Sequence, residues 1–98
     1  MNAITAKQVE ELIKEGKTLH LIDVREVDEV AAGKIPGVVN IPLGLLEFRM
    51  HELDKSKDYI IVCRSGARSG RATQFLKSYG YKVSNMLGGM LSWEGSVE

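Results

Sequence analysis

The chain has 98 residues, of which 44% are apolar, and its 13 basic residues balance its 13 acidic ones. This length predicts one small domain over residues 1–98 with one modest core. The balanced charge argues against a nucleic acid or an anionic membrane as the main partner, and no stretch approaches the roughly 20 apolar residues of a membrane span, so we expect a cytoplasmic protein.

The first part of the chain predicts helices and strands in alternation. Thr5 and Gln8 have the spacing of a capping box, and apolar residues at helical spacing follow them. A helix is therefore expected over residues 6–15. A short apolar run predicts a strand over residues 19–24, and a short helix is expected to follow and to end near Gly33.

The alternation continues to the end of the chain. The expected elements are a strand over 38–41, a helical stretch over roughly 43–53, a strand over 59–62, a helix over 69–79, a strand over 83–87 and a short terminal helix carrying Trp93. The strand over 59–62 is a continuous apolar run, which is typical of burial on both faces. Together these elements predict an α/β fold with a central, mainly parallel sheet of four to five short strands and helices on both faces.

The loop after the strand over residues 59–62 is the place to look for chemistry, because ligands of such sheets bind outside the carboxyl ends of the strands. Cys63, the only cysteine, stands there. A single cysteine forms no internal disulfide and gives no support to a cysteine-rich zinc site. A lone cysteine at the end of a buried strand is usually a small core residue, but the loop from Arg64 to Arg68 contains a glycine and two arginines and opens a helix, which favours a reactive thiol.

Each residue type in this loop has a use in holding an anion. The start of a helix leaves backbone N–H groups without carbonyl partners, and Gly66 permits the positive φ that turns them toward one point. The helix dipole, Arg64 and Arg68 add positive charge, and Ser65 and Ser69 are further donors. A cysteine facing this anion cradle is expected to ionise below the reference pKa of about 8.5.

Four segments of the chain together resemble a known family. They are Asp23-Val24-Arg25-Glu26, the run from Gly33 to Pro42, the run from Cys63 to Ser69, and Gly88-Gly89 followed by Trp93. From about Leu21 to Trp93 the chain is similar to the single-domain rhodaneses, which are thiosulfate sulfurtransferase-like proteins. Lys34 stands where that family often has histidine and Val38 where it often has alanine, which could alter the rim of the pocket.

The resemblance implies a rhodanese-like three-layer fold and a role for each loop residue. Cys63 corresponds to the catalytic cysteine, and the substrate-binding residues are Arg64, Ser65, Gly66, Ala67, Arg68 and Ser69. The expected activity moves a sulfane sulfur from an anionic donor such as thiosulfate, through a Cys63 persulfide, to cyanide, a small thiol or a protein thiol. No metal or cofactor is implied. Because the chain has no second cysteine, the acceptor must be external.

Two other functions are compatible with a cysteine loop of this kind. The chain could be a persulfide carrier or protein-interaction module that a partner loads, with little turnover of free thiosulfate. It could instead be a phosphatase or an arsenate reductase. Phosphatases that share the rhodanese fold use Cys-x-x-x-x-x-Arg, whereas Arg68 lies only five positions after Cys63, so the shorter loop favours sulfur transfer.

Several other polar or aromatic residues are expected to be structural. Asp23 and Arg25 end the first expected strand and could brace the active-site loop or contact substrate, but they are interpreted as a structural ion pair. Trp93 is interpreted as a core residue. Arg71, one turn into the helix after the loop, either extends the positive field or lies on a solvated helix face.

Overall fold

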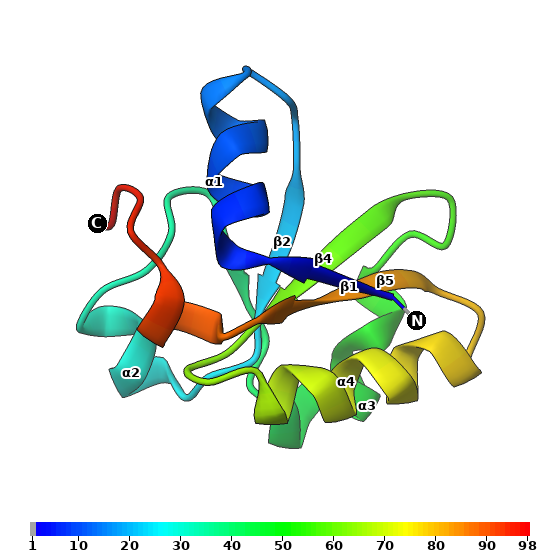
Figure 1. Ribbon diagram of the computed structural model, residues 1–98. Helices are drawn as coiled ribbons and strands as arrows, with labels where there is room; N and C mark the ends of the chain where they lie inside the picture. Colours follow the sequence, from blue (N-terminus) through cyan, green and yellow to red (C-terminus); the bar gives the residue numbers. More distant parts are fainter. Residues whose placement is uncertain (1) are drawn as a thin grey trace.

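The computed structural model describes residues 2–98, and the five strands within them form one sheet in the order β1-β5-β4-β2-β3 (Figure 1). The strands are β1 (Ala3–Thr5), β2 (His20–Asp23), β3 (Val39–Asn40), β4 (Asp58–Val62) and β5 (Lys82–Leu87). All neighbouring pairs are parallel. The predicted parallel α/β fold is therefore confirmed, with β4 in the centre as its apolar run indicated.

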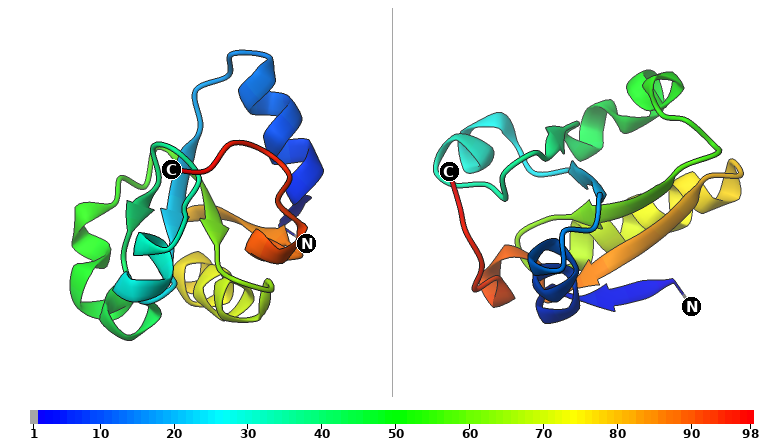
Figure 2. Two further views of the ribbon diagram at one scale, coloured as in Figure 1. Left: turned by 90° about the vertical axis from the view of Figure 1, so that its left-hand side faces the viewer. Right: turned by 90° about the horizontal axis from the view of Figure 1, so that it is seen from above.

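Helices cover both faces of this sheet, so the predicted three-layer arrangement is also confirmed. They are α1 (Ala6–Lys14), α2 (Val27–Ala31), α3 (Leu46–Arg49) and α4 (Ala67–Ser78), with 3₁₀ turns η1 (Leu43–Leu45), η2 (Met50–Glu52) and η3 (Gly89–Ser92). Figure 2 shows α1 on one side of the sheet and α3 and α4 on the other. None of the helices between residues 2 and 98 combines the length and apolarity that a membrane span requires.

Side chains that alternate along the strands build two cores, one on each side of the sheet. Ile22 and Ile61 pack toward α3 and α4, whereas their neighbours Leu21 and Val62 pack toward α1. Alternate residues of a strand point to opposite faces, so a strand covered on both sides needs apolar residues at successive positions. Cys63 continues the Ile61 side and therefore faces α4.

The edge strand β1 was not predicted. Thr5 does cap α1 through the predicted capping box with Gln8. The three residues before the helix, however, also pair with β5, where Ala3 is opposite Asn85 and Ile4 is opposite Met86. A strand of three residues has too few positions to show a period, and its partner lies at the far end of the chain.

The predicted helical segments are present, but three of them differ in detail. The stretch over 43–53 is not one helix but the succession of η1, α3 and η2. The terminal 3₁₀ turn η3 ends at Ser92, so Trp93 follows it rather than lying within it. The helix expected from Ser69 begins at Ala67, because Gly66 takes a φ of +102° and turns the chain directly into α4. This early start places Ser69 in the first helical turn, where its backbone N–H has no helical partner.

Candidate functional site

Cys63 lies at the carboxyl edge of the sheet, directly after β4, as the sequence predicted. Its side chain is fully buried, with 0% of the residue exposed, and it packs in the core between the sheet and α4. The sulfur therefore lies at the base of the loop rather than on its surface. The next two residues of the loop, Arg64 and Ser65, are exposed.

The sulfur of Cys63 is surrounded by hydrogen-bond donors from the loop and the first turn of α4. The Gly66 N–H donates to Sγ over 3.0 Å, and the Ser69 hydroxyl oxygen lies 3.2 Å from Sγ. These two groups are the hydrogen-bond donors to the sulfur among residues 2–98. Sγ thus occupies the point at which the free N–H groups of the helix start converge.

These donors decide the acidity of the thiol. Burial raises the pKa of Cys63, but hydrogen bonds from the Ser69 side chain and from the backbone N–H groups of Ser69, Gly66 and Ser65 lower it by more, so the pKa lies below its ordinary value. The thiolate is the nucleophilic form of cysteine. The geometry therefore favours a reactive sulfur, which is uncommon for a buried core cysteine.

The turn η3 holds the opposite side of the loop. The Met90 N–H donates to the Cys63 carbonyl and the Leu91 N–H to the Arg64 carbonyl, each over 2.9 Å. Gly89 makes this contact possible, since a Cβ at that position would lie 2.5 Å from each of these carbonyl oxygens. Because the carbonyls are bound by η3, the N–H groups of the loop are left to turn toward the sulfur.

Asn85 of β5 is a site residue that the sequence analysis missed. Its amide Nδ2 donates to the Gly66 carbonyl over 3.1 Å, and its Oδ1 lies 2.5 Å from the Ser69 hydroxyl oxygen. It thus bridges the loop and the first turn of α4. Nothing local in the sequence marks it, because it lies in the middle of a strand and 16 positions from Ser69.

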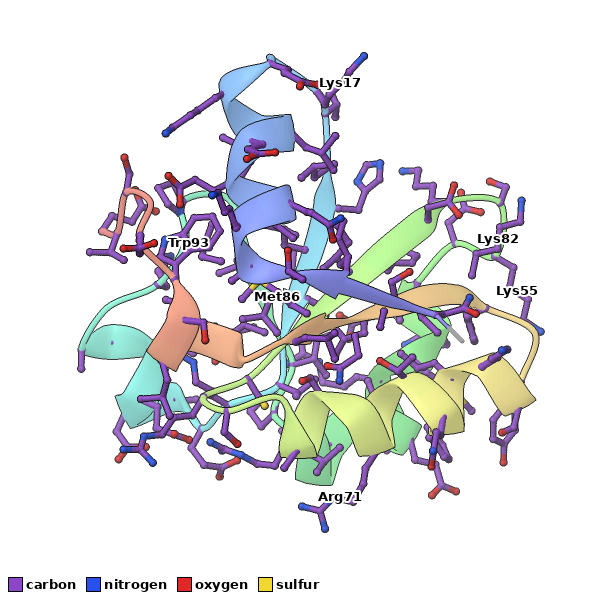
Figure 3. All side chains as sticks on the ribbon, viewed as in Figure 1. Lys17, Lys55, Arg71, Lys82, Met86 and Trp93 are labelled. Carbon is purple, nitrogen blue, oxygen red and sulfur yellow. The ribbon has the colours of Figure 1, made fainter. Side chains whose placement is uncertain are left out.

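The two arginines of the loop differ in their surroundings. Arg68 forms a two-point ion pair with Glu29 of α2, with N–O distances of 2.6 and 2.8 Å. Its hydrogen bond lowers the pKa of Glu29 to about 2 and raises that of Arg68. Arg64 and Ala67 are exposed, and Figure 3 shows Arg71 pointing away from the ribbon on the solvated side of α4. The cradle around the sulfur therefore consists of neutral donors, and the charge of Arg68 is shared with a carboxylate.

Two groups that the sequence analysis interpreted as structural lie in packed parts of the fold. Arg25 is 6% exposed and Asp23 0%; their side chains pair over 2.8 Å, and the guanidinium also donates to the Gly33 carbonyl over 2.8 Å. Trp93 packs against the core beside α1 (Figure 3) and donates its indole N–H to the Ser96 carbonyl. The predicted ion pair is therefore confirmed, whereas Trp93 is partly buried and packs against the core rather than within it.

Comparisons with known proteins place the sequence and the fold in one family. The sequence model of the rhodanese-like domain matches residues 5–96. YtwF of Bacillus subtilis, which its name assigns provisionally to the sulfurtransferases, is 43% identical over 95 residues that span 97% of this chain and 92% of YtwF. YrkF of the same organism, named provisionally as a sulfur carrier protein, is 38% identical over 96 residues, which are 97% of this chain and 52% of YrkF. The crystal structure of a rhodanese-like domain protein from Staphylococcus aureus superimposes with a TM-score of 0.94 at 31% identity, covering 100% of this chain and 97% of that one.

Proposed function

This chain belongs to the rhodanese-like domain family, and from that premise we propose that it is a sulfurtransferase that moves a sulfane sulfur from thiosulfate to a nucleophilic acceptor through a persulfide on Cys63. The observation that carries the proposal is that the Gly66 N–H and the Ser69 hydroxyl group meet the Cys63 sulfur at the end of β4. These donors lower the pKa of the thiol and can equally hold the negative charge of a persulfide.

In the first half-reaction, the Cys63 thiolate attacks the outer sulfur of thiosulfate. A bond forms between Sγ and that sulfur, the sulfur–sulfur bond of thiosulfate breaks, and sulfite leaves with the electron pair. Arg64, Ser65 and Arg68 hold the anionic end of the donor, while Gly66, Ala67 and Ser69 form the turn that presents the N–H groups. Since Cys63 is fully buried, the exposed part of the loop must shift to admit the donor.

In the second half-reaction, an acceptor attacks the outer sulfur of the persulfide. The bond between this sulfur and Sγ breaks, and the Cys63 thiolate is regenerated. The acceptor is external because the chain has one cysteine, so cyanide, a small thiol or a cysteine of another protein must take the sulfur. Donor and acceptor therefore use the same site in turn, and ping-pong kinetics are expected.

Mass spectrometry after treatment with thiosulfate tests the proposal. We expect a gain of one sulfur atom, which cyanide removes and which is absent in Cys63→Ser. The serine variant keeps a hydrogen-bonding side chain of similar size, so it separates the loss of the nucleophile from a change in the loop. An unmodified mass after exposure to thiosulfate would contradict the choice of this donor.

The arginines are tested by comparing two variants of α4. Arg68→Ala should raise KM for thiosulfate several-fold, because one positive charge near the anionic donor is lost. Arg71→Ala is the matched control, since its side chain is exposed one turn further along the same helix. Equal kinetics for the two variants would remove Arg68 from the donor-binding residues.

A second candidate is a persulfide carrier that receives its sulfur from a partner protein. The likeness to YrkF and the complete burial of Cys63 favour it, because a buried thiol is a poor target for free donors. Loading by a cysteine desulfurase, combined with very slow uptake from thiosulfate, would select the carrier. Fast uptake from thiosulfate alone would select the transferase.

A further inference from the structure

The hydroxyl group of Ser69 has two acceptors and one proton. Its oxygen lies 3.2 Å from the sulfur of Cys63 and 2.5 Å from Oδ1 of Asn85. A serine hydroxyl can donate only one hydrogen bond at a time. The sulfur and the amide oxygen therefore compete for this proton.

The orientation of the Asn85 amide is fixed by its other neighbour. The Gly66 carbonyl lies 3.1 Å from Nδ2, and a carbonyl oxygen can only accept a hydrogen bond. The amide NH₂ group must therefore face Gly66, which leaves Oδ1 facing Ser69. Because Oδ1 can only accept, a bond between these two side chains requires the hydroxyl proton to point at Asn85 and away from the sulfur.

We propose that Asn85 is a positioning residue that directs the Ser69 hydroxyl and thereby limits how many hydrogen bonds the loop gives to the anionic sulfur of Cys63. This inference rests on the proposed sulfur transfer and assigns a role to a residue outside the loop. While Asn85 holds the proton, the Gly66 N–H still donates to the sulfur over 3.0 Å. When the proton turns to the sulfur, the bond to Asn85 is lost.

A limit of this kind has a chemical use in sulfur transfer. Each added hydrogen bond lowers the pKa of a thiol and also makes the thiolate a weaker nucleophile. A thiol attacks fastest when its pKa is close to the ambient pH, because it is then both ionised and reactive. By competing for one donor, Asn85 keeps the sulfur from being over-stabilised.

The charged side chains near the site are paired with one another and do not bond the Cys63 sulfur in place of the Ser69 hydroxyl group. Arg68 of α4 is paired with Glu29 of α2, and Asp23 and Arg25 at the end of β2 are paired with each other. Among residues 2–98, none of these four side chains forms a hydrogen bond to the Cys63 sulfur. A change at Asn85 therefore leaves the surrounding ion pairs intact.

The test is a pH titration of the ultraviolet absorbance of the thiolate, taken as the difference from Cys63→Ser. Asn85→Leu removes both amide groups at similar size, and the Gly66 carbonyl still accepts the Gly70 N–H over 3.0 Å. We expect this variant to lower the pKa of Cys63 by about one unit, because the Ser69 hydroxyl turns fully to the sulfur. Asn85→Asp should raise it, since a carboxylate holds the hydroxyl more strongly and adds negative charge.

The same two variants in a Ser69→Ala background separate positioning from a structural role. With the hydroxyl removed, Asn85→Leu should no longer lower the pKa, and the rise caused by Asn85→Asp should shrink. If Asn85→Leu does not fold, the Asn85→Asp pair alone gives this coupling. A shift of the same size with and without Ser69, or a higher pKa in Asn85→Leu, would overturn the proposal.

The titration uses no sulfur donor, so it is independent of the proposed activity. Coupling between Asn85 and Ser69 without persulfide formation would refute the sulfurtransferase and leave the role of Asn85 standing. Persulfide formation without coupling would refute the role of Asn85 and leave the sulfurtransferase standing.

Discussion

The ends of β2 and β4 lie side by side in the sheet, yet they are built from different interactions. In the register of the two strands Asp23 is opposite Val62, so Asp23 with Arg25 and Cys63 with its loop are direct neighbours. The end of β2 holds two full charges that bind each other in a buried site. The end of β4 holds a sulfur among neutral N–H and O–H donors.

This difference shows how a buried site can accommodate a group that changes its charge during a reaction. A buried charge left without its partner costs several kcal/mol, so a permanent pair such as Asp23 with Arg25 suits a structural brace. In the proposed reaction, the sulfur alternates between neutral and anionic forms. Preorganised dipoles stabilise the anion without leaving an unpaired charge when the anion is absent.

The largest expected loss of stability comes from removing the carboxylate of Asp23 at the end of β2. Asp23→Ala leaves the guanidinium of Arg25 buried without its carboxylate and should lower the free energy of unfolding by about 3–5 kcal/mol. Urea denaturation measures this loss. Asp28→Ala, an exposed carboxylate in α2, is the control and should change it by less than about 0.5 kcal/mol. A loss of unfolding free energy in Asp23→Ala no larger than in the control would show that the ion pair does not stabilise the fold.

The next largest loss of stability is expected where η3 contacts the loop after β4. Gly89→Ala places a Cβ 2.5 Å from the carbonyl oxygens of Cys63 and Arg64 at a φ of +55°, so the loop must move away from η3. We expect a loss of about 2–3 kcal/mol in unfolding free energy and less persulfide per molecule by mass spectrometry. Gly44→Ala is the control, because nothing lies within 4 Å of its added Cβ. A normal persulfide yield in Gly89→Ala would contradict the role of η3.

A smaller loss of stability is expected from breaking the ion pair between Arg68 and Glu29, which lies beside the Cys63 loop. Arg68 lowers the pKa of Glu29 from 4.5 to about 2, so the pair stabilises the fold above pH 4.5 and this stability is lost as the pH falls toward 2. The pair is partly exposed, so Glu29→Gln should cost about 1 kcal/mol at neutral pH. Urea denaturation at several pH values should show wild type and variant converging in acid. A gap that stays constant with pH would mean that the ion pair is not its source.

The smallest effect on stability is expected at the exposed rim. Arg64→Ala should change the free energy of unfolding by less than about 0.5 kcal/mol, because the side chain is exposed. Its KM for thiosulfate should nevertheless rise, since the proposed donor is an anion that passes this residue. An unchanged KM, measured with a normal thermal transition, would remove Arg64 from the donor-binding residues.

Most of the fold was predictable because local patterns carry it. The apolar run of β4, the capping box of α1 and the alternation of elements each involve residues a few positions apart. The strand β1 was missed because its three residues gain their conformation from pairing with β5. The helical stretch over 43–53 was predicted, but its division into η1, α3 and η2 was not, because apolar spacing alone does not distinguish α from 3₁₀ turns.

The sequence by itself determined where the cysteine would lie and that the start of a helix would face it. Cys63, Gly66 and Ser69 are within one strand end, one loop and one helical turn, so their placement follows from local rules. Only the tertiary structure decided that Glu29 takes the charge of Arg68 and that Asn85 competes for the proton of Ser69. These partners are separated by 39 and 16 positions, and the parallel crossovers that bring them together leave no local pattern to read.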